Sequence, residues 1–333
     1  MKKVSVIIPL YNAERWVTEG VLADVCRQNY RDMQVIVIND GSKDNTREVL
    51  EHRIEQEKDD IEYKVIHQEN SGIAETRNRA LTVATGNYVI FLDQDDHIPV
   101  DYVGHFVDAI EKEQTDILLG GYKTVDENGK LICEYHFDGN DPWSKFKFIT
   151  PWGRIYKRSF IEENRLKFLD YPIGEDIYFN LCAYAKTDRV TFVDYPEYEW
   201  VQNRASFSHT VQRKAENTDL RPLFDAILEY VGDTEDLECG YEYFFVKTAM
   251  YQIVTTLRGS AYVVARKNWE QLFGWIEENY PDYRKDIKKI EPQNETKQIR
   301  IIVKMLLWME KTKIYPLFLR MGTGFKKKGN DKI

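Results

Sequence analysis

The chain begins with short hydrophobic runs that alternate with amphipathic stretches. Val- and Ile-rich runs occupy residues 4–10, 33–40, 62–68 and 87–93, and stretches of helical character lie between them at 14–28, 44–58 and 73–84. Strands that are apolar on both faces and alternate with helices are typical of a parallel sheet covered on both sides. A further run at 116–125 extends this sheet, and the turn signal Glu127–Lys130 leads into a strand-like run at 131–137.

The rest of the chain has a different character. Residues 142–203 read as loop-rich α+β, and helical patterns continue from about residue 213 to the end. We therefore expect an α/β fold, with a mostly parallel sheet and helices on both faces, in residues 1–213. Residues 1–98 would form a Rossmann-like half and residues 99–213 a second half. A helical region would fill residues 214–333.

Polar side chains gather where the predicted strands end. In an open α/β sheet, ligands bind beyond the carboxyl ends of the strands. Residues of this kind follow all four early strands: Asn12 and Glu14 after the first, Asn39–Ser42 and Asp44 after the second, Asn70–Gly72 with Arg77 and Asn78 after the third, and Asp93, Asp95 and Asp96 after the fourth. Residues 40–44 and 70–72 could also be plain turns or helix caps.

The acidic cluster at 93–96 is the strongest chemical signal. A solvated acidic loop is one explanation, but helix caps do not need three acids behind a buried strand. Carboxylates in such a cluster favour a hard divalent cation such as Mg²⁺ or Mn²⁺, commonly shared with substrate phosphates. The chain contains neither GxGxxG nor GxxxxGK[ST]. A metal–diphosphate site is therefore a better interpretation than dinucleotide binding or P-loop chemistry.

Charge is distributed unevenly along the chain. The net charge is −9, yet residues 284–333 hold 14 Lys/Arg and 5 Asp/Glu, which leaves −18 on residues 1–283. An acidic body argues against nucleic acid as a partner. The four cysteines form no CxxC pair, so they indicate neither a zinc site nor a disulfide framework and suit a reducing cytoplasm.

Five segments in order resemble the family 2 glycosyltransferases, inverting enzymes with the A-type nucleotide-sugar fold that include bacterial surface-polysaccharide enzymes. They are SVIIPLYNAE, VIVINDGSKDNT, NSGIAETRNRAL, ATGNYVIFLDQDD and GEDIYFNL. The resemblance covers about residues 3–210 and implies a UDP-sugar donor, a divalent cation and a saccharide or lipid-linked saccharide acceptor. It also implies that residues 1–98 bind the nucleotide and residues 99–213 the acceptor.

The resemblance assigns roles to individual residues. Asp176 would be the catalytic base, and Glu175 would orient a sugar. Asp40 would accept from the base imide N–H, which favours uridine. Asp93 and Asp95 would be the two acids of a DxD motif. The implied nucleotide-sugar residues are Pro9, Tyr11, Asn12, Glu14, Asp40, Gly41, Arg77, Asp93, Gln94, Trp152, Arg204 and Ser206, and the implied metal ligands are Asp93, Asp95, Asp96 and His209.

Several alternatives remain open on the sequence alone. Glu175 and Asp176 could simply favour a helix N-terminus. Trp152 could stack on a sugar or belong to the core, and His209 could be incidental. Arg154 stands where the family often has lysine. A nucleotidyltransferase would need a glycine-rich triphosphate loop that the first strand end lacks, and a non-catalytic relative would lose an acid of the DxD motif or the late Asp.

The basic C-terminal segment, residues 298–329, combines apolar arcs with Lys and Arg. Its longest apolar run is Met305–Met309, too short to span a bilayer, so we expect it to lie on an anionic membrane surface with Leu306, Leu307, Trp308, Leu317, Phe318 and Leu319 buried there. A packed helical domain or a homodimer contact are the alternatives. The expected location is cytoplasmic and peripheral at the inner face of the membrane.

Overall fold

A computed structural model describes residues 2–57, 60–202, 219–232, 240–257, 260–281, 291–292 and 294–324. The chain divides into two compact units, Met1–Asn203 and Arg204–Ile333. The boundary predicted between residues 213 and 214 lies outside the described residues.

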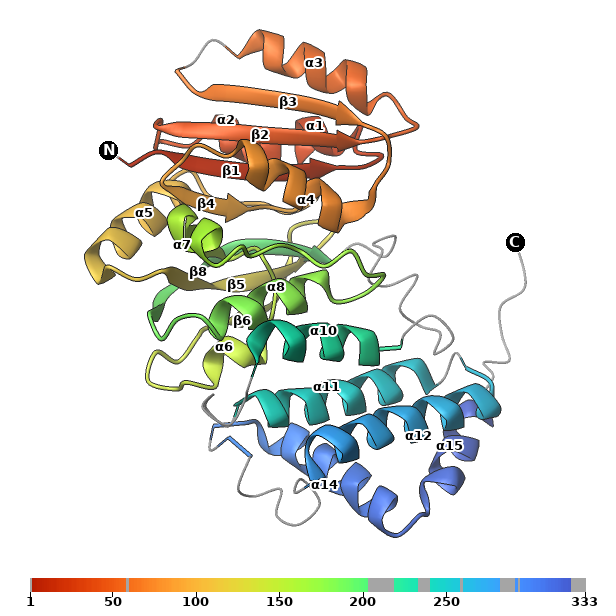
Figure 1. Cartoon of the computed structure of the whole chain (residues 1–333). Coiled ribbons are helices and arrows are strands. Elements are labelled where there is room, and N and C mark those ends of the chain that lie inside the picture. The colour runs from red at the N-terminus through yellow and green to blue at the C-terminus, as the bar shows by residue number, and fades with distance from the viewer. Residues whose placement is uncertain are drawn as a thin grey trace. The chain divides into compact units, whose positions relative to one another are not determined.

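The first unit is built around an eight-stranded sheet in the order β3-β2-β1-β4-β7-β5-β6, with β8 paired to β5 (Figure 1). Strands β3, β2, β1 and β4 are parallel, whereas β7 is antiparallel to both β4 and β5. The strands are β1 Val4–Leu10, β2 Met33–Asp40, β3 Glu62–Gln68, β4 Tyr88–Phe91, β5 Ile117–Asp126, β6 Leu131–Tyr135, β7 Arg154–Lys157 and β8 Val190–Gln202. The predicted open, mostly parallel α/β sheet is confirmed.

Burial explains why the first strands read as unbroken hydrophobic runs. Every residue of β1, β2 and β4 is buried, because helices cover both faces of the sheet there. Helix α4 packs on β1 and β2, and α1 and α2 lie on the opposite face (Figure 1). The helices of this unit are α1 Trp16–Glu19, α2 Val21–Cys26, α3 Thr46–Gln56, α4 Gly72–Val83, α5 Tyr102–Glu113, α6 Ser144–Lys147, α7 Arg158–Glu163 and α8 Glu175–Tyr184.

The helical stretch predicted over residues 14–28 is divided into two short helices, α1 and α2. Gly20 adopts an extended backbone, with φ −98° and ψ −161°, and separates α1 from α2. A Cβ at this position would lie 2.1 Å from the carbonyl oxygen of Gln94, within the acidic loop. The break therefore lets the chain pass close to the end of β4, a tertiary constraint that helical periodicity does not reveal.

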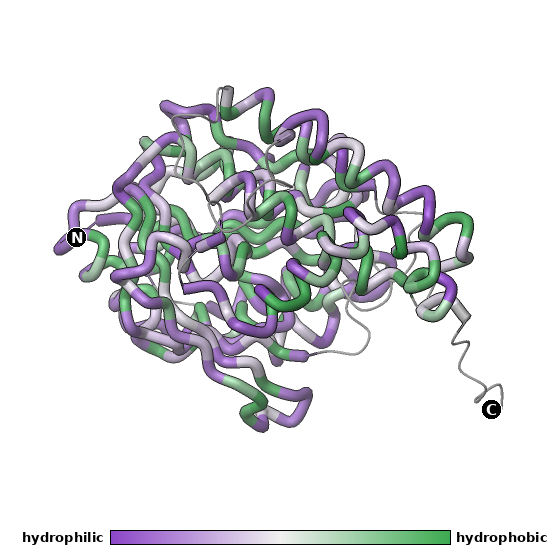
Figure 2. The backbone as a smooth tube through the Cα atoms, turned by 90° about the horizontal axis from the view of Figure 1, so that it is seen from below, coloured by the Kyte–Doolittle hydropathy of each residue, from purple (hydrophilic) through white to green (hydrophobic). Residues whose placement is uncertain are grey.

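The second unit is helical where it is described. Its helices are α10 Arg221–Val231, α11 Gly240–Thr256, α12 Tyr262–Asn279, α14 Lys297–Lys311 and α15 Tyr315–Gly324. Hydrophobic and hydrophilic positions alternate along the coils of the helices (Figure 2). Among the described residues, no helix has the length and apolar character needed to cross a membrane. Leu306 and Leu319, which we expected to enter a membrane surface, are instead fully buried in the protein.

Candidate active site

The loops after β1 and β2 are fastened to each other by side chains that the sequence singled out. Asn12 has a left-handed backbone, with φ 48°; its N–H donates to Ser42 Oγ at 2.9 Å, and its own Oδ1 accepts from the N–H of Lys43 at 2.9 Å. Glu14 accepts from Asn45 Nδ2 at 3.1 Å. Asn12, Glu14 and Asp44 line one side of an open hollow. Pro9 is buried within β1.

Gln94, between the two acids of the DxD motif, positions the loop after β1. The N–H of Tyr11 donates to Gln94 Oε1 at 2.9 Å, and Gln94 Nε2 donates to the Tyr11 carbonyl at 3.3 Å. Both ends of the amide thus bind the backbone of one residue, Tyr11, which is 42% exposed. The arrangement makes Gln94 a positioning residue and presents Tyr11 to solvent at the sheet edge.

Asp40 holds the N-terminus of α4. Its Oδ1 accepts from the N–H of Ser71 at 2.8 Å and from Gln68 Nε2 at 2.7 Å, while Oδ2 accepts from the N–H of Gly72 at 2.9 Å. Asp40 is only 4% exposed. A cap was an open alternative for this segment, but the helix that Asp40 caps is α4, reached across the sheet, rather than the helix that follows it in sequence.

Substitution of Gly41 tests how closely the loop after β2 packs against the backbone of Asn70. Its φ is +67°, and a Cβ there would lie 2.5 Å from the backbone nitrogen of Asn70. We expect Gly41→Ala to lower the melting temperature by several degrees, because about 1–2 kcal/mol of left-handed backbone cost adds to a clash with backbone that has little freedom to shift.

Gly129→Ala is the matched control for Gly41→Ala in thermal melting. Gly129 also has positive φ, +76°, but nothing lies within 4 Å of the point that a Cβ would occupy there. Gly129→Ala should therefore show the backbone cost alone. Equal melting temperatures for the two variants would contradict the close approach of Gly41 to Asn70.

Asp96 is buried, unlike Asp93 and Asp95 in the same loop after β4. Asp96 is 1% exposed; its Oδ2 accepts from the Tyr198 hydroxyl at 2.5 Å and its Oδ1 from the N–H of Val201 at 2.9 Å. Burial, followed by the negative charges of Asp95 and Asp93, raises the pKa of Asp96 well above its ordinary value. The geometry argues against Asp96 as a metal ligand: it anchors the acidic loop to β8.

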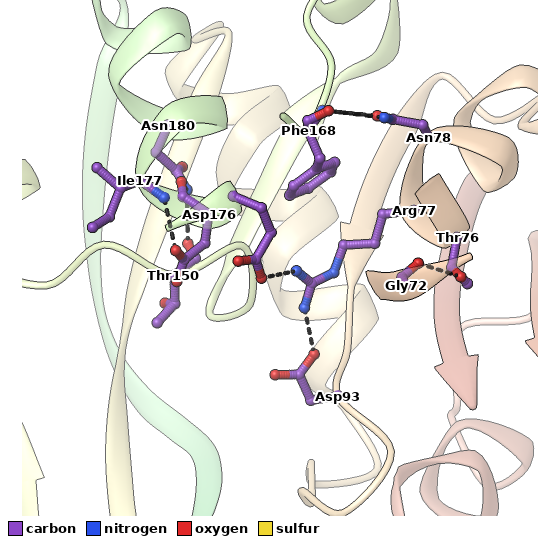
Figure 3. Close-up of polar contacts among 11 residues, drawn as sticks. Gly72, Thr76, Arg77, Asn78, Asp93, Thr150, Phe168, Asp176, Ile177 and Asn180 are labelled. Carbon is purple, nitrogen blue, oxygen red and sulfur yellow. Dashed lines mark hydrogen bonds and ion pairs between the residues drawn. The ribbon is translucent and has the colours of Figure 1, made fainter. Parts of the chain in front are cut away.

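Arg77 joins the acidic loop to the helix that carries the predicted base. Its Nη2 donates to Asp93 Oδ1 at 2.8 Å, and its Nη1 donates to Glu175 Oε1 at 3.2 Å. Figure 3 shows the guanidinium of Arg77 pointing toward Asp93, with its stem beside Phe168. The guanidinium carbon lies 5.2 Å from the centre of that ring. Arg77 is 3% exposed, so these partners are needed to offset the loss of hydration.

The charge of Arg77 is secured by its neighbours. Burial alone would lower the pKa of Arg77, but the surrounding carboxylates outweigh burial and raise it. The family resemblance placed Arg77 among the nucleotide-sugar residues. The structure adds two salt bridges, to Asp93 and to Glu175, which lies 98 positions further along the chain.

Helix α8 begins at the acidic pair. Gly174 precedes it with φ +80°, and Asp176 Oδ1 accepts from the N–H of Ile177 at 2.8 Å. Asn180 fastens this turn by donating to the carbonyls of Asp176, at 2.9 Å, and of Thr150, at 3.2 Å (Figure 3). The carboxylate of Asp176 is thus held on a short, well-connected helical turn.

The protonation of Asp176 suits proton transfer. Burial, followed by the negative charge of Glu175, raises the pKa of Asp176 from 3.8 to about 7, although Arg77 opposes the rise. A general base works best when its pKa lies near the operating pH. Asp176 therefore combines a fixed position with the protonation behaviour of a general base.

Trp152, one of the residues proposed to contact the sugar, lies in the core. It is 4% exposed and stacks on Tyr198 with ring centroids 4.4 Å apart. Its flat face is therefore covered by protein, which decides in favour of the core alternative. Arg154 is also buried; it donates to Asn180 Oδ1 at 2.6 Å and supports α8. Arg204, Ser206 and His209 lie outside the described residues.

Sequence reasoning missed Tyr198 and Asn180. The Tyr198 hydroxyl accepts from the N–H of Asp93 at 3.3 Å and donates to Asp96. It therefore holds two members of the acidic cluster at once. The only signal in the sequence was a tyrosine on a strand far from the cluster, and the antiparallel bridge between His97 and Glu199 holds β8 next to the acidic loop.

The protein ligands that remain for a cation are few. Among the described residues, no group of three His, Cys, Asp or Glu side chains is placed to hold a metal ion. Because Asp96 is used as an anchor, the carboxylates of this loop that could hold a cation are Asp93 and Asp95 of the DxD motif. Two carboxylates fit a hard cation that completes its shell with water and substrate phosphates, as Mg²⁺ commonly does.

The chain matches a known protein family. Residues 5–171 match the model named Glycosyl transferase family 2, half of the chain. The chain belongs to glycosyltransferase family 2. The match ends four residues before Glu175, so the assignment of the base in this transferase rests on the motif and on the geometry of α8.

A relative of known name is also a glycosyltransferase. The transferase is 29% identical over 248 residues to the glycosyltransferase GlyA of Streptococcus pneumoniae, an alignment that covers 69% of this chain and 34% of GlyA. It spans about a third of that protein's length.

Solved structures show the same fold. The crystal structure of Staphylococcus aureus TarS 1–349 in complex with UDP-GlcNAc matches with a TM-score of 0.63 at 21% identity, covering 84% of this chain and 92% of that one. The mannosyltransferase PcManGT of Pyrobaculum calidifontis, in complex with GDP-Man and Mn²⁺, matches with a TM-score of 0.55 at 15% identity, covering 98% and 88%.

The position of Glu175 beside Asp176 predicts a change in the pH dependence of transfer. With Asp176 titrating near pH 7, kcat/KM should fall as the pH drops below 7 because the base becomes protonated. Glu175→Gln removes the neighbouring negative charge and frees Arg77 to stabilise the Asp176 carboxylate. Both effects lower the pKa of Asp176, so the acidic limb should move roughly one pH unit lower. A limb that stays in place or rises would contradict the coupling.

Proposed function

We propose that this family 2 enzyme transfers a sugar from a UDP-sugar to a hydroxyl of a saccharide or lipid-linked saccharide acceptor, with inversion at the anomeric carbon, in bacterial cell-surface polysaccharide synthesis. The observation that carries the proposal is the salt bridge of Arg77 to Asp93 and Glu175, because it joins the predicted donor site to the helix of a carboxylate whose pKa is raised to about 7.

The chemistry proposed for the chain's own residues is a single displacement. The oxygen of the acceptor hydroxyl bonds to the anomeric carbon while Asp176 accepts the proton of that hydroxyl. The bond from the anomeric carbon to the diphosphate oxygen breaks in the same step. Attack from the face opposite the leaving group inverts the configuration. Glu175, fixed by Arg77, would orient a sugar hydroxyl. A positioned base contributes roughly 10²–10⁴-fold to the rate of such a step.

Asp93 and Asp95 are the residues proposed to hold a divalent cation, Mn²⁺ or Mg²⁺. A cation bound there would supply Lewis-acid stabilisation of the departing diphosphate. The fit rests on the two carboxylates that remain when Asp96 is used as an anchor. The structural match to PcManGT, whose complex holds Mn²⁺, is in keeping with this proposal.

The choice of uridine rests on Asp40 and on relatives. Asp40 lies at the carboxyl end of β2 beside Gly41, where the family resemblance places the base imide. TarS, a fold neighbour that binds UDP-GlcNAc, bears the name poly(ribitol-phosphate) β-N-acetylglucosaminyltransferase. PcManGT binds GDP-Man with a similar fold, so the fold alone leaves the nucleotide open and UDP remains our proposal.

A transfer assay tests the function. The protein is incubated with Mn²⁺, a panel of UDP-sugars and GDP-mannose, and oligosaccharide or lipid-linked acceptors, and release of the nucleoside diphosphate is followed. We expect UDP release from at least one UDP-sugar that increases with acceptor, and NMR of the product should show the inverted anomer. Release from GDP-mannose alone would contradict the donor assignment, and a retained anomer would contradict the mechanism.

A further inference from the structure

Helices α14 and α15 each have two apolar sides. One side enters the core of the second unit, where Val303, Leu306 and Leu319 are at most 1% exposed. The other side carries six large apolar residues that are exposed, which we call the exposed apolar face: Ile301, Ile302, Met305, Trp308, Leu317 and Met321.

The exposed apolar face follows helical spacing. Ile301, Met305 and Trp308 recur at intervals of four and three residues, and Leu317 and Met321 at an interval of four, so each set forms one stripe along its helix. Trp308 is 55% exposed and Leu317 64% exposed. Scattered exposed hydrophobic residues need no explanation, but contiguous apolar stripes indicate an interaction surface.

The charge around the face decides which partner it suits. Residues 297–324 contain six Lys/Arg and a single acid, Glu310. Glu310 is 4% exposed, accepts from Trp269 and forms a salt bridge with Lys313, and Glu291, just before α14, pairs with Arg300 and Lys304. These acids offset part of the basic charge, but residues 297–324 keep five more basic than acidic side chains. On α14, Lys304 and Lys311 lie three residues beyond Ile301 and Trp308, positions that are neighbours on a helix surface. The sequence that follows α15 adds Lys326–Lys328.

We propose that the exposed apolar face docks on a lipid bilayer that contains anionic lipids. The apolar side chains would enter the boundary between headgroups and acyl chains, Trp308 would lie at the interface, and the flanking Lys and Arg would reach the lipid phosphates. A second copy of the chain fits less well, because a two-fold contact would bring the same basic residues against each other. The proposal narrows the surface expected from the sequence, since Leu306 and Leu319 are buried inside the second unit.

Vesicle flotation with the full chain tests the docking surface. The probes are vesicles of phosphatidylcholine alone and of phosphatidylcholine with phosphatidylglycerol in equal parts. The double variant Trp308→Glu, Leu317→Glu should bind the anionic vesicles at least tenfold more weakly than the wild type. Its circular dichroism and melting temperature should be unchanged, because both side chains are exposed.

Ile132→Glu is the matched control for flotation. Ile132 is 58% exposed on β6 of the first unit, so it tests loss of an exposed apolar side chain outside the proposed face. It should bind anionic vesicles as the wild type does. Equal binding by the double variant and the wild type would overturn the proposal, as would equal binding to neutral and anionic vesicles. A wild-type dimer that the double variant converts to a monomer, with no vesicle binding, would assign the face to a second copy instead.

Discussion

Asp176→Asn is expected to lower kcat by roughly 10²–10⁴-fold while the dissociation constant of UDP stays within about threefold of the wild-type value. Asparagine keeps the shape of the side chain but has no basic oxygen to accept the proton of the acceptor hydroxyl. The nucleotide is expected to bind at the ends of β1, β2 and β4, so the substitution should leave its binding intact. Single-turnover transfer and calorimetry on the same preparation measure the two quantities.

Asp170→Asn is the control for Asp176→Asn. Asp170 is exposed and lies in the loop before α8, so it tests the loss of a carboxylate in the same segment without loss of the base. Its transfer rate should match the wild type. A fully active Asp176→Asn protein would defeat the base assignment, and joint loss of transfer and UDP binding would indicate that Asp176 serves the donor site.

Asp95→Asn is expected to weaken Mn²⁺-dependent UDP binding by about 100-fold or more and to lower transfer at least as much. The DxD motif leaves Asp93 and Asp95 as carboxylate ligands, and Asp93 is already paired with Arg77 at 2.8 Å. Loss of Asp95 therefore removes one of the two proposed carboxylate ligands, and a hard cation is bound by few protein carboxylates to begin with. Titration of UDP with and without Mn²⁺ measures the effect.

Asp96→Asn distinguishes the two neighbouring acids. Burial raises the pKa of Asp96, so loss of its negative charge costs less there than at an exposed site. In the variant, the single amide oxygen can accept from the N–H of Val201, and the amide N–H₂ can donate to the Tyr198 hydroxyl in place of the hydrogen bond that this hydroxyl donates to Asp96. We expect Asp96→Asn to retain transfer within about tenfold of the wild type. Equal losses for Asp95→Asn and Asp96→Asn would contradict the assignment of Asp96 as an anchor.

The runs at 4–10, 33–40 and 62–68 coincide with β1, β2 and β3. Strands β1 and β2 could be predicted because every residue in them is buried, which makes both runs strongly apolar, whereas β3 is only partly buried. The site loops could also be placed, since the carboxyl ends of parallel strands meet at one edge of the sheet. The break at Gly20 could not, because it reflects the nearby carbonyl of Gln94 rather than a local preference.

The hydrogen-bond, salt-bridge and stacking partners of the site residues could not be predicted from the sequence. The family resemblance implied three metal-binding acids in the 93–96 loop; the bridge between His97 and Glu199 brings Tyr198 of β8 to Asp96, so we propose Asp96 as an anchor of the loop rather than a ligand. Likewise, Trp152 has the chemistry of a sugar platform, and only its stacking on Tyr198 assigns it to the core. The salt bridge of Arg77 to Glu175 joins residues 98 positions apart, a contact that only the tertiary structure determines.

The most direct test of the proposed function is a calorimetric titration of UDP and of GDP into the purified protein, each with Mn²⁺ and with EDTA. We predict that UDP binds in Mn²⁺, that EDTA abolishes the binding, and that GDP binds at least tenfold more weakly. UDP binding that EDTA does not change would contradict the cation site at Asp93 and Asp95. Absence of UDP binding under both conditions would contradict the assignment of this sheet edge as a UDP-sugar site.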